Sequence, residues 1–288
     1  MVDTSTIEIK INGEEHIVHT GTSILKACQD LGIEIPTLCY LDGISEEAAC
    51  SLCMVEVKGA KSLVRACVTK VVSGMEVSTN TARARKARRM NIELLLASHP
   101  QDCLTCERNQ NCDLRKLAYE MGVKDIRFAK SSDHKFAWDT SSPSLVRDPN
   151  KCVLCRRCIE TCSFVQAVSA IDVTGRGKSS KVSTFMERGL GNVDCVNCGQ
   201  CLLVCPTGAI VEKDEIEDTW HSLHDPEKVV VVQTAPAVRA AIGEEFGMPA
   251  GSLVTGKMAA GLRRLGFNKV FDTQFTADLT IMEEGHEL

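Results

Sequence analysis

Two short cysteine runs constrain this chain more than any other feature of its sequence. The first, KCVLCRRCIETC, spans residues 151–162, and the second, DCVNCGQCLLVCP, spans residues 194–206. Both have the spacing C-x2-C-x2-C-x3-C, which places three thiols within seven residues. Separate zinc sites, each with a tetrahedral ligand set, do not fit at that density. Each run is therefore predicted to wrap around a metal centre that takes several thiolates from one short segment.

The rest of the composition favours metal binding over disulfides. The N-terminal segment MVDTSTIEIKINGEEH lacks the basic start and apolar run of a signal peptide. No apolar stretch approaches the roughly 20 residues that span a bilayer. We therefore expect a cytoplasmic protein whose 16 cysteines remain reduced. The net charge of −5 argues against nucleic acid as the main partner.

The repeated spacing is that of two-cluster bacterial ferredoxins. In that motif each run gives three ligands to its own [4Fe–4S] cluster, and its fourth cysteine to the other cluster. The ligands predicted for one cluster are Cys152, Cys155, Cys158 and Cys205. Those predicted for the other are Cys195, Cys198, Cys201 and Cys162. Pro206 follows the second run as the motif expects, whereas Ser163 stands where the first run would have proline.

A separate block with the spacing C-x10-C-x2-C-x13-C lies closer to the N-terminus. Its members are Cys39, Cys50, Cys53 and Cys67. The preceding segment predicts a strand, a turn at Asn12–Gly13, a second strand and a helix that starts near Ser23. These elements suit a ferredoxin-like β-grasp domain with one [2Fe–2S] cluster. The first gap is longer than in the plant-type loop, and zinc held by four thiolates is the alternative.

The segment HPQDCLTCERNQNCD carries a third candidate site. Its potential ligands are His99, Cys103, Cys106 and Cys112. We expect them to hold a [4Fe–4S] cluster, with zinc in the same four residues as the alternative. The alternative for His99 is a histidine that ends a helix and binds no metal. A neutral imidazole in place of a thiolate should raise the cluster potential, as histidine ligands do in Rieske centres.

The three blocks use fifteen of the 16 cysteines. The remaining one, Cys28, lies in the amphipathic stretch SILKACQDLG and is predicted to be a small buried residue. The basic segment RARKARRMNIELLLASHP, residues 83–100, predicts a helix whose core face carries Met90, Leu94 and Leu95. No aromatic residues interleave with its charges, so we expect a solvated or subunit-docking face there.

The C-terminal segment predicts one βαβ unit with a right-handed crossover. KVVVVQT, residues 228–234, is predicted as a buried strand, and APAVRAAIGEEFG as a helix that starts near Pro236. TGKMAAGLRRLG is predicted as a second helix, and KVFDT, residues 269–273, as a second strand. Such a unit leaves apolar sheet surface exposed, which leads to the hypothesis that this tail docks another subunit.

These segments predict an α+β protein of several domains. The expected boundaries are 1–80 for the [2Fe–2S] domain, 81–138 for the histidine-ligated [4Fe–4S] domain, 139–216 for the two-cluster ferredoxin domain and 217–288 for the α/β segment. The G-x-x-x-x-G-K match at residues 251–257 has Met258 where a nucleotide-binding loop needs a hydroxyl. We expect clusters and no substrate-converting site within the chain.

The order of the blocks resembles the N-terminal half of [FeFe]-hydrogenase large subunits. It is also similar to the large iron–sulfur subunit of complex I and to NAD-linked formate dehydrogenases. The tail VVVVQTAPAVRAAIGEEFG resembles the opening of the [FeFe]-hydrogenase catalytic domain. In that family the cysteines of the hydrogen-activating cluster lie further along, whereas this sequence has none after Cys205 and stops at Leu288. We therefore expect that the chain does not itself activate hydrogen.

The resemblance implies an electron-transfer subunit of a flavin-based, electron-bifurcating NAD(P)H/ferredoxin oxidoreductase or transhydrogenase. The partners it implies are a flavin-bearing NADH-oxidising subunit, a small thioredoxin-like [2Fe–2S] subunit and ferredoxin. Two alternatives remain. The chain is an N-terminal fragment of a hydrogenase catalytic subunit, or it is a free-standing multi-cluster ferredoxin that acts as a carrier.

Overall fold

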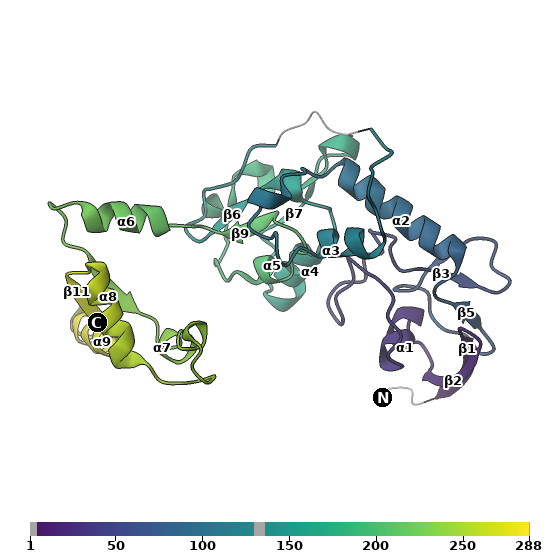
Figure 1. The fold of residues 1–288 in the computed structure, drawn as a ribbon, viewed down its shortest axis with the longest axis horizontal. Helices are drawn as coiled ribbons and strands as arrows, with labels where there is room; N and C mark the ends of the chain where they lie inside the picture. Colours follow the sequence, from purple (N-terminus) through teal and green to yellow (C-terminus); the bar gives the residue numbers. More distant parts are fainter. Residues whose placement is uncertain (1–4, 130–135, 288) are drawn as a thin grey trace. The chain divides into compact units, whose positions relative to one another are not determined.

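The computed structural model describes residues 5–129 and 136–287 of the chain (Figure 1). The chain divides into two compact units, Met1–Lys213 and Asp214–Leu288. All 16 cysteines belong to the first unit, since the last of them is Cys205. Every candidate ligand identified from the sequence therefore lies in one unit.

The first unit begins with the predicted hairpin and helix. Strands β1 (Thr6–Ile11) and β2 (Glu14–His19) pair antiparallel. They are joined at Asn12 and Gly13, whose φ angles of 55° and 94° are those of a tight hairpin turn. Helix α1 (Ile24–Asp30) starts after Ser23, whose side chain caps the helix by accepting from the Lys26 N–H. The strand, turn, strand and helix predictions are confirmed.

A mixed five-stranded sheet forms the core of this region. The other strands are β3 (Met54–Val57), β4 (Val64–Arg65) and β5 (Glu76–Ser78), and the strand order is β2-β1-β5-β3-β4. Strand β5 runs parallel to β1 and antiparallel to β3. The apolar face of α1 packs against the buried side chains of this sheet. Cys28 on that helix has 0% exposed surface, which confirms its predicted burial.

Helix α2 (Ala82–Ala97) starts after Thr81, whose hydroxyl caps the Ala84 N–H. The prediction for its core face is wrong for Met90 and Leu94, which are 42% and 46% exposed, whereas Leu95 packs partly buried against the core. The buried positions are Ala84, Arg88, Ile92, Glu93 and Ala97.

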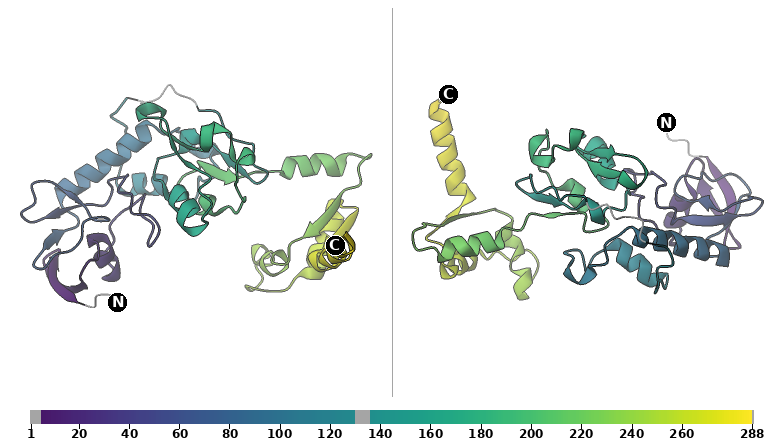
Figure 2. Two further views of the ribbon diagram at one scale, coloured as in Figure 1. Left: turned by 180° about the vertical axis from the view of Figure 1, so that it is seen from behind. Right: turned by 90° about the horizontal axis from the view of Figure 1, so that it is seen from above.

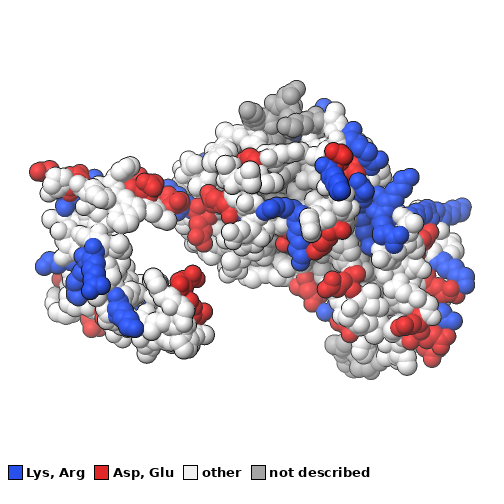
Figure 3. Space-filling model, in the orientation of Figure 1, with Lys and Arg blue, Asp and Glu red and all other residues white. Residues whose placement is uncertain are grey.

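The physical reason lies in the backbone beneath the helix. The Arg88 guanidinium donates to the carbonyl oxygens of Met54 and Thr79, so that side chain must face inward. The basic side chains at positions 83, 85, 86 and 89 are exposed. Figure 3 shows Lys and Arg side chains gathered over the region of α2.

The remainder of the first unit is built from short elements. They are α3 (Asp113–Glu120), β6 (Leu145–Arg147), α4 (Arg157–Glu160), a π-helical segment (Thr161–Val165), β7 (Asp172–Thr174), β8 (Lys181–Ser183), α5 (Gln200–Leu203) and β9 (Ile210–Glu212). Strand β6 precedes the first cysteine run and β9 follows the second, and the two pair antiparallel. The two runs are thereby held within one small domain.

The second unit contains α6 (Ile216–His224), β10 (Val231–Thr234), α7 (Val238–Ala241), α8 (Thr255–Leu265), β11 (Lys269–Asp272) and α9 (Thr273–Glu287). Strands β10 and β11 pair in parallel, so the predicted βαβ order is confirmed. Helix α9 extends from the end of β11 as a single helix (Figure 2).

Two details of the tail differ from the prediction. Strand β10 is not buried, and its Val231 is 56% exposed, because a sheet of two strands covers little of either face. The helix expected from Pro236 is only four residues long and is followed by a 3-10 turn at Glu244–Phe246. In the two ranges that the structure describes, no helix is both long and apolar enough to cross a membrane.

Candidate metal centres

The two ferredoxin-like runs share one unusual backbone conformation. Leu154 and Arg156 have φ angles of 52° and 63°, and the equivalent Asn197 and Gly199 have 52° and 74°. Only one of these four residues is glycine, and the left-handed region is otherwise rare for L-residues. In the first run the Leu154 backbone nitrogen donates to Cys152 Sγ at 3.4 Å. The repeated conformation is that of a loop that wraps a sulfur-ligated centre.

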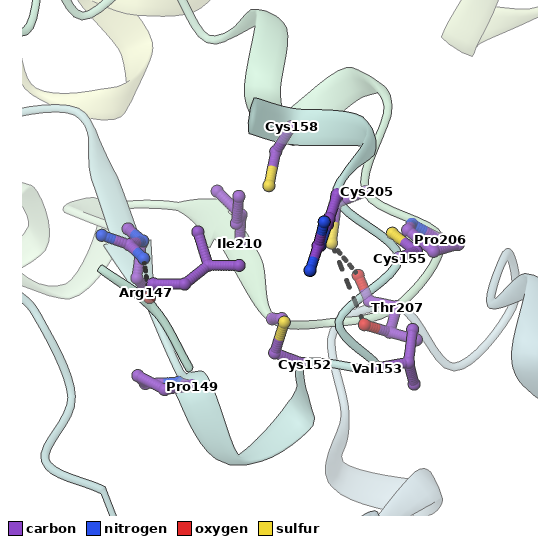
Figure 4. Close-up of a pocket in the computed structure, with 13 residues that line it drawn as sticks. Arg147, Pro149, Cys152, Val153, Cys155, Cys158, Cys205, Pro206, Thr207 and Ile210 are labelled. Carbon is purple, nitrogen blue, oxygen red and sulfur yellow. Dashed lines mark hydrogen bonds between the residues drawn. The ribbon is translucent and has the colours of Figure 1, made fainter. Parts of the chain in front are cut away.

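The cysteines of the two runs line two pockets in an interleaved grouping. One pocket is lined by Cys152, Cys155, Cys158 and Cys205. The other is lined by Cys162, Cys195, Cys198 and Cys201. Figure 4 shows the sulfur atoms of Cys152, Cys158 and Cys205 turned toward a common space. Each pocket thus combines three cysteines of one run with the last cysteine of the other.

The backbone that follows the fourth cysteine differs between the two runs. After Cys205, Pro206 cannot continue a helix, and Cys205 Sγ contacts the Thr207 carbonyl oxygen at 3.2 Å. After Cys162, Ser163 permits the chain to continue through the π-helical segment, in which the Gln166 N–H donates to the Thr161 carbonyl. The missing proline of the first run is therefore accommodated by a wider helical turn.

Burial of the ferredoxin-type thiols opposes their ionisation. It raises the pKa of Cys155 to about 12 and that of Cys201 to about 11. Burial also raises the pKa of Cys152 and Cys158. Because a thiol must lose its proton to bind a metal, a metal held by these residues would have to supply the positive charge that stabilises their thiolates.

The first block is arranged as two pairs. The Cys53 and Cys67 sulfurs lie 3.3 Å apart. A hydrogen bond with Cys67 lowers the pKa of Cys53 to about 7, and one with Cys39 lowers the pKa of Cys50 to about 7. The pKa of the other thiol in each pair is raised, since each pair keeps one proton. Two pairs of thiolates are the ligand arrangement of a two-iron core, in which each iron takes two.

The second block is partly assembled around Cys112. Burial raises the pKa of Cys112, and the charges of Cys106 and Cys103 add to that shift. His99 follows α2, and its Nδ1 is buried without a hydrogen-bond partner. Burial lowers the pKa of His99, so the imidazole is neutral and can act as a ligand. An orphaned buried nitrogen four residues before Cys103 in sequence is compatible with a metal-bound histidine.

The three blocks contact one another within the first unit. One apolar cluster contains Cys39 and Cys50 from the first block, Cys155 from the third, and Cys112 packed against it from the second. In the described part of the chain, no three or more His, Cys, Asp or Glu side chains have the spacing needed to hold one metal ion. The thiols of the two ferredoxin-type runs nevertheless line two pockets, and those of the first block lie in two pairs.

Several residues at these sites were not predicted from the sequence. Arg147 is 5% exposed, lines the pocket of Cys152 and forms an ion pair with Asp139 at 3.7 Å. Arg108 lies two residues after Cys106, and Lys151 lies one residue before Cys152. Their closeness in sequence to the candidate cysteines could have marked them as site residues. Nothing in the sequence showed that their side chains face inward.

Four known sequence families match the chain in succession. Residues 4–82 match a 2Fe-2S iron–sulfur cluster binding domain, and residues 88–127 match the NADH-ubiquinone oxidoreductase-G iron–sulfur binding region. Residues 139–209 match a 4Fe-4S dicluster domain, and residues 228–288 match the C-terminal domain of the iron-only hydrogenase large subunit. The chain therefore contains both 2Fe-2S and 4Fe-4S binding domains.

Similar proteins are found among hydrogenase and oxidoreductase subunits. The chain is 47% identical, over 98% of its length, to the NADP-reducing hydrogenase subunit HndD of Solidesulfovibrio fructosivorans. It is 37% identical, over 97% of its length, to iron hydrogenase 1 of Clostridium pasteurianum. In both cases it spans 49% of the relative, about half of that protein's length.

Two further similarities extend beyond these hydrogenases. The NADPH-Fe(3+) oxidoreductase subunit alpha of Geobacter sulfurreducens is 34% identical over 72% of this chain, which covers 24% of that protein. A chain of the NAD+-reducing [NiFe]-hydrogenase crystal structure superposes with a TM-score of 0.68 at 27% identity, covering 73% of this chain and 88% of that one. Over nearly its whole length the chain is therefore similar to the N-terminal iron–sulfur half of hydrogenase-like proteins.

Proposed function

We propose that the chain is the electron-transfer part of a multi-subunit, NAD(P)-linked oxidoreductase. The observation that carries the proposal is the apolar cluster that joins cysteines of all three blocks: Cys39, Cys50, Cys112 and Cys155. A dry, contiguous path between redox sites is what a chain of electron carriers requires. The names of the similar proteins, which are subunits of hydrogenases and oxidoreductases, support the same role.

The proposed ligand sets follow the groupings of the cysteines. The first block holds one [2Fe–2S] cluster, with Cys39 and Cys50 on one iron and Cys53 and Cys67 on the other. The remaining three sites hold [4Fe–4S] clusters. Their ligands are His99, Cys103, Cys106 and Cys112; Cys152, Cys155, Cys158 and Cys205; and Cys162, Cys195, Cys198 and Cys201. When bound, the clusters supply one-electron redox chemistry, and the chain holds them close together and away from water.

The proposed partners are a flavin-bearing NADH-oxidising subunit, a small thioredoxin-like [2Fe–2S] subunit and ferredoxin. In the proposed complex the flavin splits electron pairs from NAD(P)H, and this chain conducts single electrons. The exposed apolar side chains of the second unit, among them Phe275 and Ile281, are where we propose that the flavin-bearing subunit docks. Electron bifurcation and transhydrogenase activity are the specific reactions proposed for the assembled complex.

Anaerobic purification from the native host tests this proposal. A tagged chain should co-purify with flavin and with a subunit that oxidises NAD(P)H, and the complex should reduce ferredoxin at the expense of NAD(P)H. A chain that elutes alone, without flavin, would instead be a free-standing carrier.

One alternative function has a specific observation in its favour. Residues 228–288 match the C-terminal domain of the iron-only hydrogenase large subunit, so the chain can be part of a hydrogenase. Hydrogen uptake by the purified complex, measured with a dye acceptor, separates the two possibilities. Uptake that depends on this chain would favour the hydrogenase.

A further inference from the structure

Three cationic side chains lie between the His99 site and the first ferredoxin-type site. They are Arg108, Lys151 and Arg157, here called the cationic seam. Arg108 Nη2 donates to the Cys205 carbonyl oxygen at 3.1 Å, from the second block to the third. Arg157 Nη1 lies 3.4 Å from Asp113 Oδ2, from the third block to the second. The side chains of Lys151 and Arg157 are only 12% and 13% exposed.

The segments that carry the seam meet closely at Gly208. A Cβ atom at this position would lie 2.8 Å from Cys106 Sγ, 3.6 Å from Lys151 Cδ and 3.7 Å from Arg108 Cβ. The backbone ties the same segments together, since the Thr207 hydroxyl donates to the Lys151 carbonyl oxygen at 2.7 Å. The cations are therefore part of the contact between two cluster sites and not part of the outer surface.

Two cations of the seam face carboxylates, Arg157 at Asp113 and Lys151 at two aspartates, whereas Arg108 has no carboxylate partner among the described residues. Arg108 forms no ion pair with any residue in the ranges 5–129 and 136–287, and its Nε is buried without a partner. The Nε of Arg157 is likewise buried without a partner. Lys151 faces Asp102 at 3.4 Å and Asp148 at 3.9 Å. A buried cation is costly unless a negative charge lies nearby.

The negative charge is available from the two cluster sites. A four-iron cluster with thiolate ligands is anionic and becomes more negative when it is reduced. A fixed cation beside it stabilises the reduced form more than the oxidised form, which raises the reduction potential. Arg108 contacts Cys205, and Cys106 lies with Arg108 and Lys151 around Gly208, so the seam adjoins residues of both sites.

We propose that the cationic seam raises the reduction potentials of the His99 cluster and of the Cys152 cluster, so that an arriving electron is held at this pair. The inference rests on the proposed function, because it requires clusters at both sites. It assigns Arg108, Lys151 and Arg157 as positioning residues that act on the clusters by charge. The competing explanation is that these side chains only hold the two segments together and do not affect the potentials.

The test is an EPR-monitored redox titration of the cluster-loaded full chain. In Arg108→Gln, the reduced-to-oxidised ratio of the Cys152 cluster at a fixed ambient potential should fall about tenfold, which is about 59 mV for a one-electron couple. Arg108→Lys, which keeps the charge, should restore most of the potential. The matched control is Lys116→Gln, which removes an exposed cation on α3 and should shift no potential.

A second variant addresses the other side of the seam. Lys151→Met keeps the main-chain carbonyl that binds Thr207 and should lower the potential of the His99 cluster. The proposal is overturned if Arg108→Gln and Lys151→Met keep full iron and wild-type potentials. It is also overturned if Arg108→Lys loses iron as Arg108→Gln does, because the arginine would then act by shape. Too little iron in the wild-type chain would instead contradict the proposed function.

Discussion

Gly208 and Cys106 approach each other so closely that a Cβ atom at position 208 would lie 2.8 Å from Cys106 Sγ. Gly208 is separated from Cys106 by more than a hundred residues in sequence and lies in the segment that follows Cys205. The contact brings a ligand of the second block next to the backbone of the third. Glycine is needed here because of the close approach, and no unusual φ angle is involved.

Gly208→Ala should selectively damage the His99 site. The added methyl group must displace either the Cys106 sulfur or the backbone of the third block. Cys106 is a proposed ligand, and that backbone carries the proposed ligand Cys205. We expect iron to fall by about four per chain, the content of one [4Fe–4S] cluster. The matched control is Gly256→Ala in α8, where a Cβ meets nothing within 4 Å. That variant should keep all iron and gain up to about 1 kcal/mol in free energy of unfolding.

Anaerobically prepared chain should contain about fourteen irons and no zinc: two in the first block and about four in each of three other sites. Iron and zinc analysis by mass spectrometry measures this directly. One zinc with ten irons would assign zinc to the His99 site. One zinc with twelve irons would assign zinc to the first block.

His99→Cys should keep a cluster but lower its reduction potential, because an anionic thiolate replaces a neutral imidazole. His99→Ala should destabilise or lose the cluster and slow electron transfer through the chain. Redox titration followed by EPR distinguishes these outcomes. Unchanged spectra and potentials in His99→Ala would mean that the buried histidine is not a ligand.

Cys28→Ala should change no cluster signal. Burial raises the pKa of Cys28 to about 11, so its thiol stays protonated at neutral pH, and its neighbours are apolar side chains of the sheet. Because the sulfur fills space in the core, we expect the free energy of unfolding to fall by about 1 kcal/mol. Cys53→Ala is the comparison and should lose the [2Fe–2S] signal. Loss of any signal in Cys28→Ala would show that the proposed ligand sets are wrong.

Removal of residues 214–288 should leave iron content and EPR spectra unchanged, because the first unit contains every proposed ligand. The shortened chain should no longer co-purify with the flavin-bearing partner or deliver electrons to the final acceptor, if the second unit provides the docking surface. Full assembly and turnover without these residues would contradict the docking proposal. Loss of iron would contradict the independence of the first unit.

The local features of this protein were determined by its sequence. The turn at Asn12–Gly13 and the cap at Ser23 depend on backbone and side-chain chemistry within a few residues, and both are present in the structure. The spacing within each cysteine run depends on the same short range. It is reflected in matching left-handed residues in the two runs, Leu154 with Arg156 and Asn197 with Gly199.

Tertiary structure alone decided what lies between the cluster sites. Nothing near Arg88 in the sequence indicates that its guanidinium satisfies the Met54 and Thr79 carbonyls, in an orientation of α2 that leaves Met90 and Leu94 exposed. In the same way, the meeting of Cys106, Arg108 and Gly208 joins segments that are distant in sequence. Short-range spacing specifies ligands because a few backbone angles determine the local geometry. Packing between distant segments depends on which buried groups find partners, and that becomes known only when the chain is folded.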